Sequence, residues 1–153
     1  MSILSTKILL AVDGSKEAYL SARAAADIAR LSGSELHLVH VEEHPPHLLA
    51  DYGPFVYTDT EAIQSVVERA ERQAREVLNK QVARVKDIVG TISQSYFRQR
   101  YPDQEIVRLA EEIGAGLIVI GSRGLGGMRR ALMGSVSDSL VRHAHCAVLV
   151  VRA

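Results

Sequence analysis

The chain has 153 residues, of which 47% are hydrophobic and 24% charged, enough for one domain that buries about two-thirds of the surface of its unfolded chain. Its 18 basic residues balance its 18 acidic residues, so no overall field favours a polyanion such as DNA or an anionic membrane. Because it has a single cysteine, Cys146, and only a short apolar run near the N-terminus, we expect no internal disulfide and no secretory signal. The expectation is one domain over residues 1–153, located in the cytoplasm.

The first third of the chain predicts a strand, a helix and a second strand. The fully apolar run Lys7–Val12 is typical of a buried parallel strand. In Lys16–Ser32 the alanines form a small-residue face that can pack close to a sheet, and Gly33 follows as the expected C-cap. Leu36–Val41 predicts the second strand. Glu42–Asp59 has three prolines, two histidines and no regular period, which indicates a long loop.

The rest of the chain continues this alternation. Thr58 and Glu61 have the spacing of a capping box, and apolar residues at helical intervals then predict a long helix to near Val89, which Gly90 ends. The remaining predicted elements are a third strand at Thr91–Phe97, a helix opened by Pro102 and stopped by Gly114, a fourth strand at Leu117–Ile120, a last helix at Val136–Ala144 and a fifth strand at Ala147–Val151.

Strands that alternate with helices predict an α/β fold, an open parallel five-stranded sheet with helices on both faces. Ligands bind such sheets at the carboxyl ends of the strands, where the winding direction reverses. Two strands end in residues suited to a ligand, the first at Asp13-Gly14-Ser15 and the fourth at Gly121. The two segments would face one crevice if the first and fourth strands are neighbours in the sheet. The spacing of residues in the sequence does not give the strand order.

The segment Leu117–Asp138 changes from an apolar run into glycines and then into a helical pattern. Two residues separate Gly121 from Gly124, and nine more separate Gly124 from Gly134, which Ser135 follows. Glycines let the backbone approach a ligand closely, and the free N–H groups and positive dipole end of a helix attract anions. The segment therefore predicts a site for a nucleotide phosphate.

The chain resembles the universal stress protein family in the pattern G-x2-G-x9-G-[ST], formed by Gly121, Gly124, Gly134 and Ser135. The early Asp13 and the terminal sequence HCAVLVV add to the match, which spans essentially the whole chain. The ATP-binding branch of the family carries this loop, and the branch that does not bind nucleotide lacks it. The resemblance implies a Rossmann-like sheet of strand order 3-2-1-4-5, in which the first and fourth strands are neighbours.

The same resemblance implies how ATP, ADP or AMP would be held. The Asp13 carboxylate would accept hydrogen bonds from the ribose hydroxyls, and the backbone at Val41 would read the adenine edge. Ala11 and Val12 would line the base and the sugar. The other implied binding residues are Gly121, Arg123 and Gly124 around the ribose and phosphates, and Gly134, Ser135, Val136 and Ser137 as donors to phosphate oxygens. Mg²⁺ would be held mainly through the phosphates.

The resemblance also implies a homodimer, formed by antiparallel contact of the last strands, Ala147–Val151. An edge strand leaves backbone groups unpaired, which a second copy would cover, although the chain's own helices could shield the edge instead. The chain departs from the family at Gly116 and Ala147, where Asp and Pro are frequent. Neither position is expected to touch a nucleotide.

Several of these residues also have simpler explanations. Asp13-Gly14-Ser15 could be only a turn with a helix cap. Ser135 and Asp138 have capping-box spacing, so Ser135 could cap its helix as well as bind phosphate. Arginines on a loop are usually solvated, and only Arg123, which lies between two glycines, is well placed for a phosphate.

The histidines do not predict a metal site. His44 and His47 lack an acidic or cysteine partner at suitable spacing, and His37 and His40, three apart in a strand, should point to opposite faces. At the end of the last helix the histidines should meet the negative dipole pole, and Cys146 should pack as a small hydrophobic residue.

The sequence contains no P-loop pattern and no complete G-x-G-x-x-G, and we identify no nucleophile elbow and no metal-holding acid beside the glycine loop. We therefore expect a nucleotide-dependent regulator or sensor with slow or no hydrolysis. Two alternatives stay open, namely a slow ATPase or nucleotidyl transferase, and an interaction module that binds no nucleotide.

Overall fold

The computed structural model describes residues 7–13, 15–42, 60–122 and 133–152. Helices and strands alternate along these residues from the first element to the last. The elements are β1 (Lys7–Val12), α1 (Lys16–Ser32), β2 (Glu35–Glu42), α2 (Thr60–Val89), β3 (Gln94–Gln99), α3 (Pro102–Ile113), β4 (Leu117–Gly121), α4 (Ser135–His143) and β5 (Ala147–Val151).

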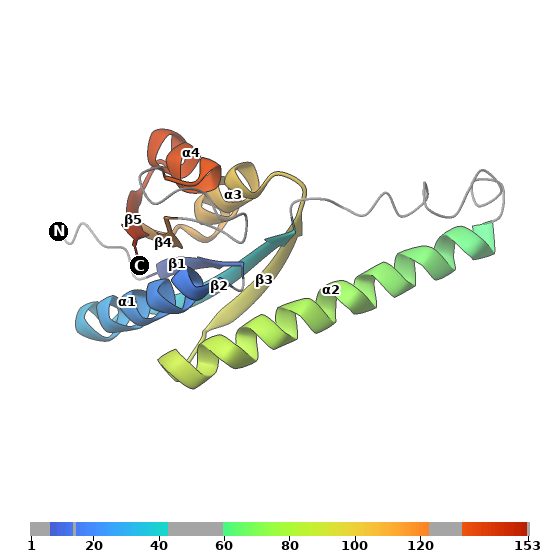
Figure 1. Cartoon of the computed structure of the whole chain (residues 1–153), viewed down its shortest axis with the longest axis horizontal. Coiled ribbons are helices and arrows are strands. Elements are labelled where there is room, and N and C mark those ends of the chain that lie inside the picture. The colour runs from blue at the N-terminus through green and yellow to red at the C-terminus, as the bar shows by residue number, and fades with distance from the viewer. Residues whose placement is uncertain (1–6, 14, 43–59, 123–132, 153) are drawn as a thin grey trace.

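The strands form one parallel sheet in the order β3-β2-β1-β4-β5 (Figure 1). Helices α1 and α2 cover one face of this sheet, and α3 and α4 cover the other (Figure 1). The predicted α/β class and the order 3-2-1-4-5 are confirmed. The winding direction therefore reverses between β1 and β4, the point at which parallel sheets of this kind place their ligands.

The core has two halves, one on each face of the sheet. Ile8 and Leu10 pack under α1 and α2, whereas Leu9 and Ile118 pack under α3 and α4. All four side chains are 0% exposed. Because both faces of the central strands are covered, β1 is a continuous apolar run and shows no alternation with polar residues.

Helix α1 lies against the sheet through the small-residue face that the sequence predicts. Ala18, Ala22 and Ala25 are buried in the core, and Ala29 packs against it. Small side chains let the helix backbone come close to β1 and β4. This close approach brings the first turn of α1 next to the end of β4.

Helix α2 is longer than the sheet that it covers. Its C-terminal half packs on the core through Leu78, Val82, Val85 and Val89, and its N-terminal half extends beyond the strands (Figure 1). The long helix predicted from the apolar spacing is confirmed to its end at Val89. The predicted cap at Thr58 lies outside the described residues.

Three helices end at the glycines that the sequence predicts. Gly33 and Gly114 are C-caps with φ of 67°, and Gly90 follows α2 with φ of 85°. A left-handed conformation at this position pairs the last carbonyls of a helix and is costly for residues with a Cβ atom.

We expect Gly114→Ala to lower the free energy of unfolding by about 1–2 kcal/mol, the cost of placing a Cβ atom in the left-handed region. A Cβ atom at Gly114 would meet nothing within 4 Å, so conformation and not crowding sets this cost. Gly33→Ala is the matched variant, because Gly33 has the same φ and equally open space. Urea unfolding measures both losses, and an unchanged midpoint for either variant would contradict the assignment.

The third strand and the last helix are shifted along the chain from their expected positions. The third strand was expected at Thr91–Phe97 and is found at Gln94–Gln99, because β2 runs on to Glu42 and β3 pairs with it in register as far as Gln99. The last helix was expected at Val136–Ala144 and is found one residue earlier at both ends. The other strands and helices lie within a residue or two of their predicted positions.

Candidate functional site

The carboxyl ends of β1 and β4 meet at the reversal point of the sheet. The register pairs Ile8 with Leu117 and Leu10 with Val119, and its continuation places Val12 opposite Gly121. The two chain segments chosen from the sequence, one after β1 and one after β4, therefore start side by side. The sequence predicted that both segments face one crevice if β1 and β4 are neighbours, and the two strands are neighbours.

Asp13 organises the turn between β1 and α1. Its Oδ1 atom accepts a hydrogen bond of 2.9 Å from the backbone N–H of Ser15. The hydroxyl of Ser15 in turn accepts from the N–H of Ala18 at 3.3 Å, so Ser15 is the N-cap of α1. The turn and the helix cap expected of Asp13 and Ser15 are both present. The half-buried Asp13 carboxylate lies just after the end of β1, and its Oδ2 atom accepts no hydrogen bond from the described residues.

The backbone at the end of β2 faces the space beyond β1. Leu36 and Glu42 direct their carbonyls to β3, where they accept from Ser93 and Arg100. Backbone groups of successive strand residues alternate in direction, so the N–H and C=O of Val41 point toward β1, which ends at Val12. The main chain at Val41 is thus oriented toward the carboxyl end of β1, next to the Asp13 turn.

The residues expected to line a base lie on opposite faces of β1. Ala11 is 7% exposed and packs under α3 and α4, and Val12 is 5% exposed and packs under α1. The carbonyl of Val12 accepts a hydrogen bond from Nδ1 of His40 at 3.1 Å. Both side chains therefore belong to the core, and only the backbone of these two residues lies at the carboxyl end of β1.

Gly121 is packed against the first turn of α1. A Cβ atom added there would lie 2.9 Å from Cβ of Glu17, closer than side chains approach one another. The position therefore excludes a side chain for a structural reason that sequence reasoning missed. The adjacent Ser122 donates its hydroxyl to Oε2 of Glu17 at 3.0 Å, and both residues are buried.

Ser122 also joins β4 to α4 and β5 through its backbone. Its N–H donates to the carbonyl of Val151 at 2.8 Å, and its own carbonyl accepts from the N–H of Gly134 at 2.6 Å. The hydroxyl of Ser137 lies 3.1 Å from the Ser122 carbonyl and 3.0 Å from that of Gly134. The two ends of the segment between β4 and α4 are thus held together at its base.

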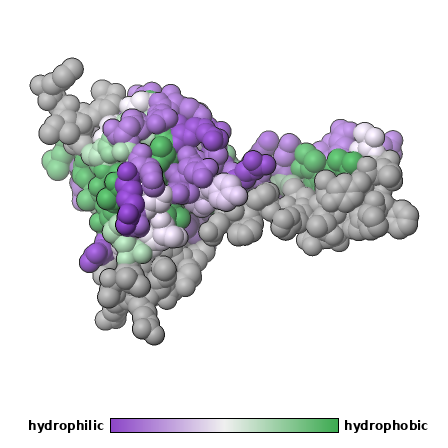
Figure 2. Space-filling view, turned by 90° about the horizontal axis from the view of Figure 1, so that it is seen from above, coloured by the Kyte–Doolittle hydropathy of each residue, from purple (hydrophilic) through white to green (hydrophobic). Residues whose placement is uncertain are grey.

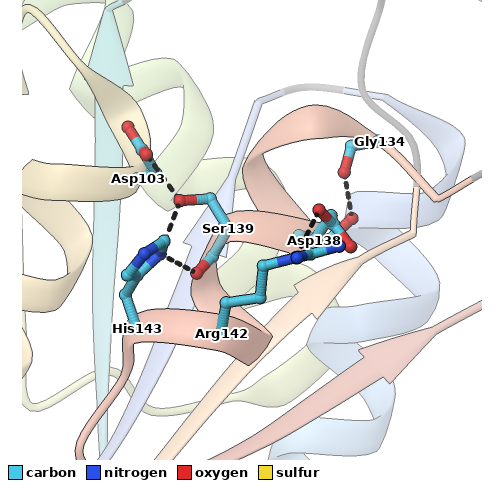
Figure 3. Close-up of polar contacts among 7 residues, drawn as sticks. Asp103, Gly134, Asp138, Ser139, Arg142 and His143 are labelled. Carbon is cyan, nitrogen blue, oxygen red and sulfur yellow. Dashed lines mark hydrogen bonds and ion pairs between the residues drawn. The ribbon is translucent and has the colours of Figure 1, made fainter.

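The start of α4 corrects the expectation for Ser135. The helix begins at Ser135, with Gly134 in the N-cap position, so Ser135 is not the capping residue. Asp138, its supposed capping-box partner, instead pairs its carboxylate with Nε of Arg142 at 3.0 Å, while its N–H donates to the Gly134 carbonyl (Figure 3). Ser135 is exposed, whereas Ser137 is 2% exposed and its hydroxyl is engaged by backbone carbonyls.

Several predicted features lie outside the described residues. They are Arg123, Gly124, the pair His44 and His47, the capping residue Thr58, and the loop residues 43–59 and 123–132.

A serine, a histidine and an aspartate that sequence reasoning did not connect come together between α3 and α4 (Figure 3). The Ser139 hydroxyl donates to Oδ2 of Asp103 at 2.6 Å. Nδ1 of His143 lies 2.9 Å from the Ser139 carbonyl and 3.3 Å from its hydroxyl. Because the serine proton goes to Asp103 and Nδ1 faces a carbonyl, this imidazole is a donor and does not activate Ser139 as a nucleophile. The cluster fastens α4 to α3.

The other histidines of the described residues and the cysteine have structural partners. His37 and His40 point to opposite faces of β2, as predicted, and His37 binds the Tyr96 hydroxyl and Oε2 of Glu35, both at 3.1 Å. Cys146 packs against the core under α3 and α4, and burial raises the pKa of its thiol, an effect that backbone hydrogen bonds oppose. No three His, Cys, Asp or Glu side chains within the described residues gather as a metal site.

Comparison with known proteins identifies the family. The family model for the universal stress protein family matches residues 5–152. A universal stress protein of Methanocaldococcus jannaschii is 30% identical over 149 residues, which cover 97% of this chain and 83% of that protein. A putative universal stress protein of Staphylococcus aureus is 36% identical over 150 residues, covering 95% and 82%.

Solved structures show the same fold. The universal stress protein from Archaeoglobus fulgidus in complex with dAMP matches with a TM-score of 0.59 and 25% identity over 97% of this chain and 98% of that chain. A universal stress protein in complex with cAMP matches with a TM-score of 0.61 and 21% identity over 97% and 98%. In the described part of the chain no helix has the length and apolar character needed to span a membrane. Because the family model matches nearly all of its length and a relative is 36% identical over 95% of it, this chain belongs to the universal stress protein family.

Proposed function

We propose that this protein binds ATP at the carboxyl ends of β1 and β4 and acts as a dimeric, nucleotide-dependent regulator in the stress response, with slow or no hydrolysis. The observation that carries the proposal is the fastening of Gly134 to Ser122, which sets the N-terminus of α4 beside the end of β4. The turn that holds Asp13 lies at the same edge, after β1. Family members with bound dAMP and cAMP support an adenine nucleotide as the ligand.

In this proposal the phosphates lie at the N-terminus of α4. The first backbone N–H that pairs within the helix is that of Asp138, so the N–H groups of Ser135, Val136 and Ser137 have no acceptor inside α4. Free N–H groups and the positive end of the helix dipole together favour an anion. Arg123 and Gly124 would complete the phosphate site, and Mg²⁺ would be held mainly by the phosphates.

The nucleoside would lie across the ends of β1 and β2. The half-buried Asp13 carboxylate would accept from the ribose hydroxyls, since Oδ1 is already used by Ser15 and Oδ2 remains as the acceptor. The main chain of Val41, which points toward β1, would read the adenine edge, and the backbone of Ala11 and Val12 would border the base and sugar.

Hydrolysis would be slow because fast phosphoryl transfer needs a base or water-positioning group beside the phosphate. Glu17 packs against the end of β4, and its Oε2 atom is occupied by the Ser122 hydroxyl. A slow ATPase would be the better description if purified protein released phosphate at several turnovers per second and Asp13→Ala abolished the release.

Nucleotide retention tests the proposal directly. Mass analysis of the purified, heat-denatured protein should reveal a bound adenine nucleotide. Titration calorimetry of the emptied protein with ATP and Mg²⁺ should give heat, and ATP should raise the unfolding temperature by mass action. No heat together with no stabilisation would favour the interaction module that binds no nucleotide.

The dimer would form through β5, which is an edge strand of the sheet. Figure 2 shows hydrophobic residues gathered at the end of the molecule where β5 lies. Since Val151 directs its carbonyl to Ser122 at the end of β4, alternation directs the N–H groups of Val148 and Val150 outward. An outward row of backbone groups beside apolar side chains suits pairing with a second copy.

We expect Val150→Pro to weaken dimerisation about tenfold, because each protomer loses an outward N–H donor worth about 0.5–1.5 kcal/mol. The proline leaves the β4 side of the ladder intact, since the N–H of Val150 does not face β4. Val150→Ala keeps the donor and should dimerise like the unmodified chain. Sedimentation velocity over a concentration series measures the difference, and a dimer of equal strength in both variants would rule out this edge.

A further inference from the structure

The end of β4 is held from three directions by one buried residue. The side chain of Ser122 binds Glu17 in α1, its N–H binds the carbonyl of Val151 in β5, and its carbonyl binds the N–H of Gly134 before α4. Ser122 is 4% exposed and Glu17 is 6% exposed. A hydrogen bond to a buried carboxylate is charge-assisted and therefore restricts geometry more than a neutral one.

This hydrogen bond ties together the two halves of the proposed nucleotide site. Glu17 lies two residues after the N-cap Ser15, whose N–H holds the Asp13 carboxylate. Gly121 packs directly on Glu17, so the first turn of α1 cannot shift relative to β4 without disturbing both contacts. On the other side, Ser122 fixes Gly134 and thereby the first turn of α4.

We propose that Glu17 and Ser122 are positioning residues, which hold the N-terminus of α4 at the distance from Asp13 that a nucleoside triphosphate requires. The inference rests on the proposed function and adds a determinant of phosphate affinity that touches no ligand. Glu17 is 6% exposed, and its Oε2 atom is taken by the Ser122 hydroxyl. Its effect reaches the phosphates through Ser122 and Gly134, and it leaves the nucleoside end of the site alone.

The test compares the affinities for ATP and adenosine, measured by titration calorimetry. Ser122→Ala and Glu17→Ala should each weaken ATP binding about tenfold or more, because the end of β4, and with it the start of α4, loses its side-chain tie to α1, and should change adenosine binding less than about threefold. Glu17→Gln keeps an oxygen that can accept from the Ser122 hydroxyl, so it should retain most of the ATP affinity. This selective loss and its rescue would not follow from a general loss of stability.

Ser139→Ala is the matched control. Like Ser122→Ala, it removes a hydrogen bond from a serine hydroxyl to the carboxylate of a helix residue, here Asp103 of α3. Ser139 itself lies beyond the first turn of α4. The control variant should lower the unfolding temperature without changing the ratio of ATP to adenosine affinity. Circular dichroism shows whether each variant is folded, and Ser122→Cys, with a weaker donor, provides a milder replacement should Ser122→Ala unfold.

Equal loss of ATP and adenosine affinity in the Ser122 and Glu17 variants, or unchanged ATP affinity, would overturn the inference. So would a Ser139→Ala variant that changes the ratio as much as Ser122→Ala does. Wild-type protein that binds neither ATP nor adenosine would instead overturn the proposed function, and the inference with it. The wild-type titration therefore separates the two failures.

Discussion

Asp13→Ala should bind ATP about 10 to 150 times more weakly than the unmodified chain, because a hydrogen bond to a charged acceptor contributes about 1.5–3 kcal/mol. In the proposed complex the Asp13 carboxylate accepts from the ribose hydroxyls through the oxygen that Ser15 does not use. Titration calorimetry measures the loss. It should appear equally with ATP and AMP, since the ribose contact does not depend on the number of phosphates.

Two controls separate the ribose contact from the turn that Asp13 also supports. Asp13→Asn keeps an oxygen for the N–H of Ser15 but replaces the second oxygen with an NH2 group that cannot accept from the ribose hydroxyls, so its loss should approach that of Asp13→Ala while the turn is kept. The ligand 2′,3′-dideoxy-ATP lacks both ribose hydroxyls and should bind Asp13→Ala and the unmodified chain alike. A full loss with the dideoxy ligand would assign Asp13 to the turn alone.

Gly121→Ala should lower the free energy of unfolding by about 1–3 kcal/mol, the usual cost of forcing an extra carbon into a packed interior. The added Cβ atom would lie 2.9 Å from Cβ of Glu17 and 3.4 Å from its carbonyl carbon. Neither atom is the movable end of a side chain, so α1 or β4 has to shift. Urea unfolding measures the loss, and the shift should also weaken ATP binding.

A double-mutant cycle identifies the clash as the cause. Glu17→Gly removes the Cβ atom that the new methyl group meets, so the loss caused by Gly121→Ala should be smaller in the Glu17→Gly background than in the unmodified chain. Additive losses would show that the crowding arises elsewhere. An undiminished free energy of unfolding for Gly121→Ala would show that β4 and α1 are packed less tightly than the structure indicates.

Much of the fold could be predicted from the sequence because its signals are local. The run Lys7–Val12 is apolar without alternation because both faces of the sheet are covered, and Gly33 and Gly114 stop helices because a left-handed C-cap favours glycine. The strand order came from the resemblance to a family and not from spacing, and the structure confirms it. The boundary of β3 was wrong because it is set by the length of β2, whose residues pair with positions 57 further along the chain.

The candidate site divides in the same way. The sequence alone located the turn at Asp13 and the glycines before α4, since turn and helix-start chemistry is written in neighbouring residues. Ser135 begins the helix and does not cap it, as the sequence had suggested it could. The hydroxyl of Ser137 is engaged by the carbonyls of Ser122 and Gly134, so only its N–H stays a candidate donor to phosphate. The pairing of Glu17 with Ser122 spans 105 residues of chain, and no spacing rule connects them.

The sequence by itself determined the alternation of strands and helices, the ends of the helices and the family, because each depends on the order of residues within a few turns of chain. Only the tertiary structure decided why Gly121 has no side chain and what holds Gly134, because both depend on α1 packing across the end of β4. Contacts of that kind are set by the geometry of the folded core, where residues far apart in the chain compete for the same few ångströms.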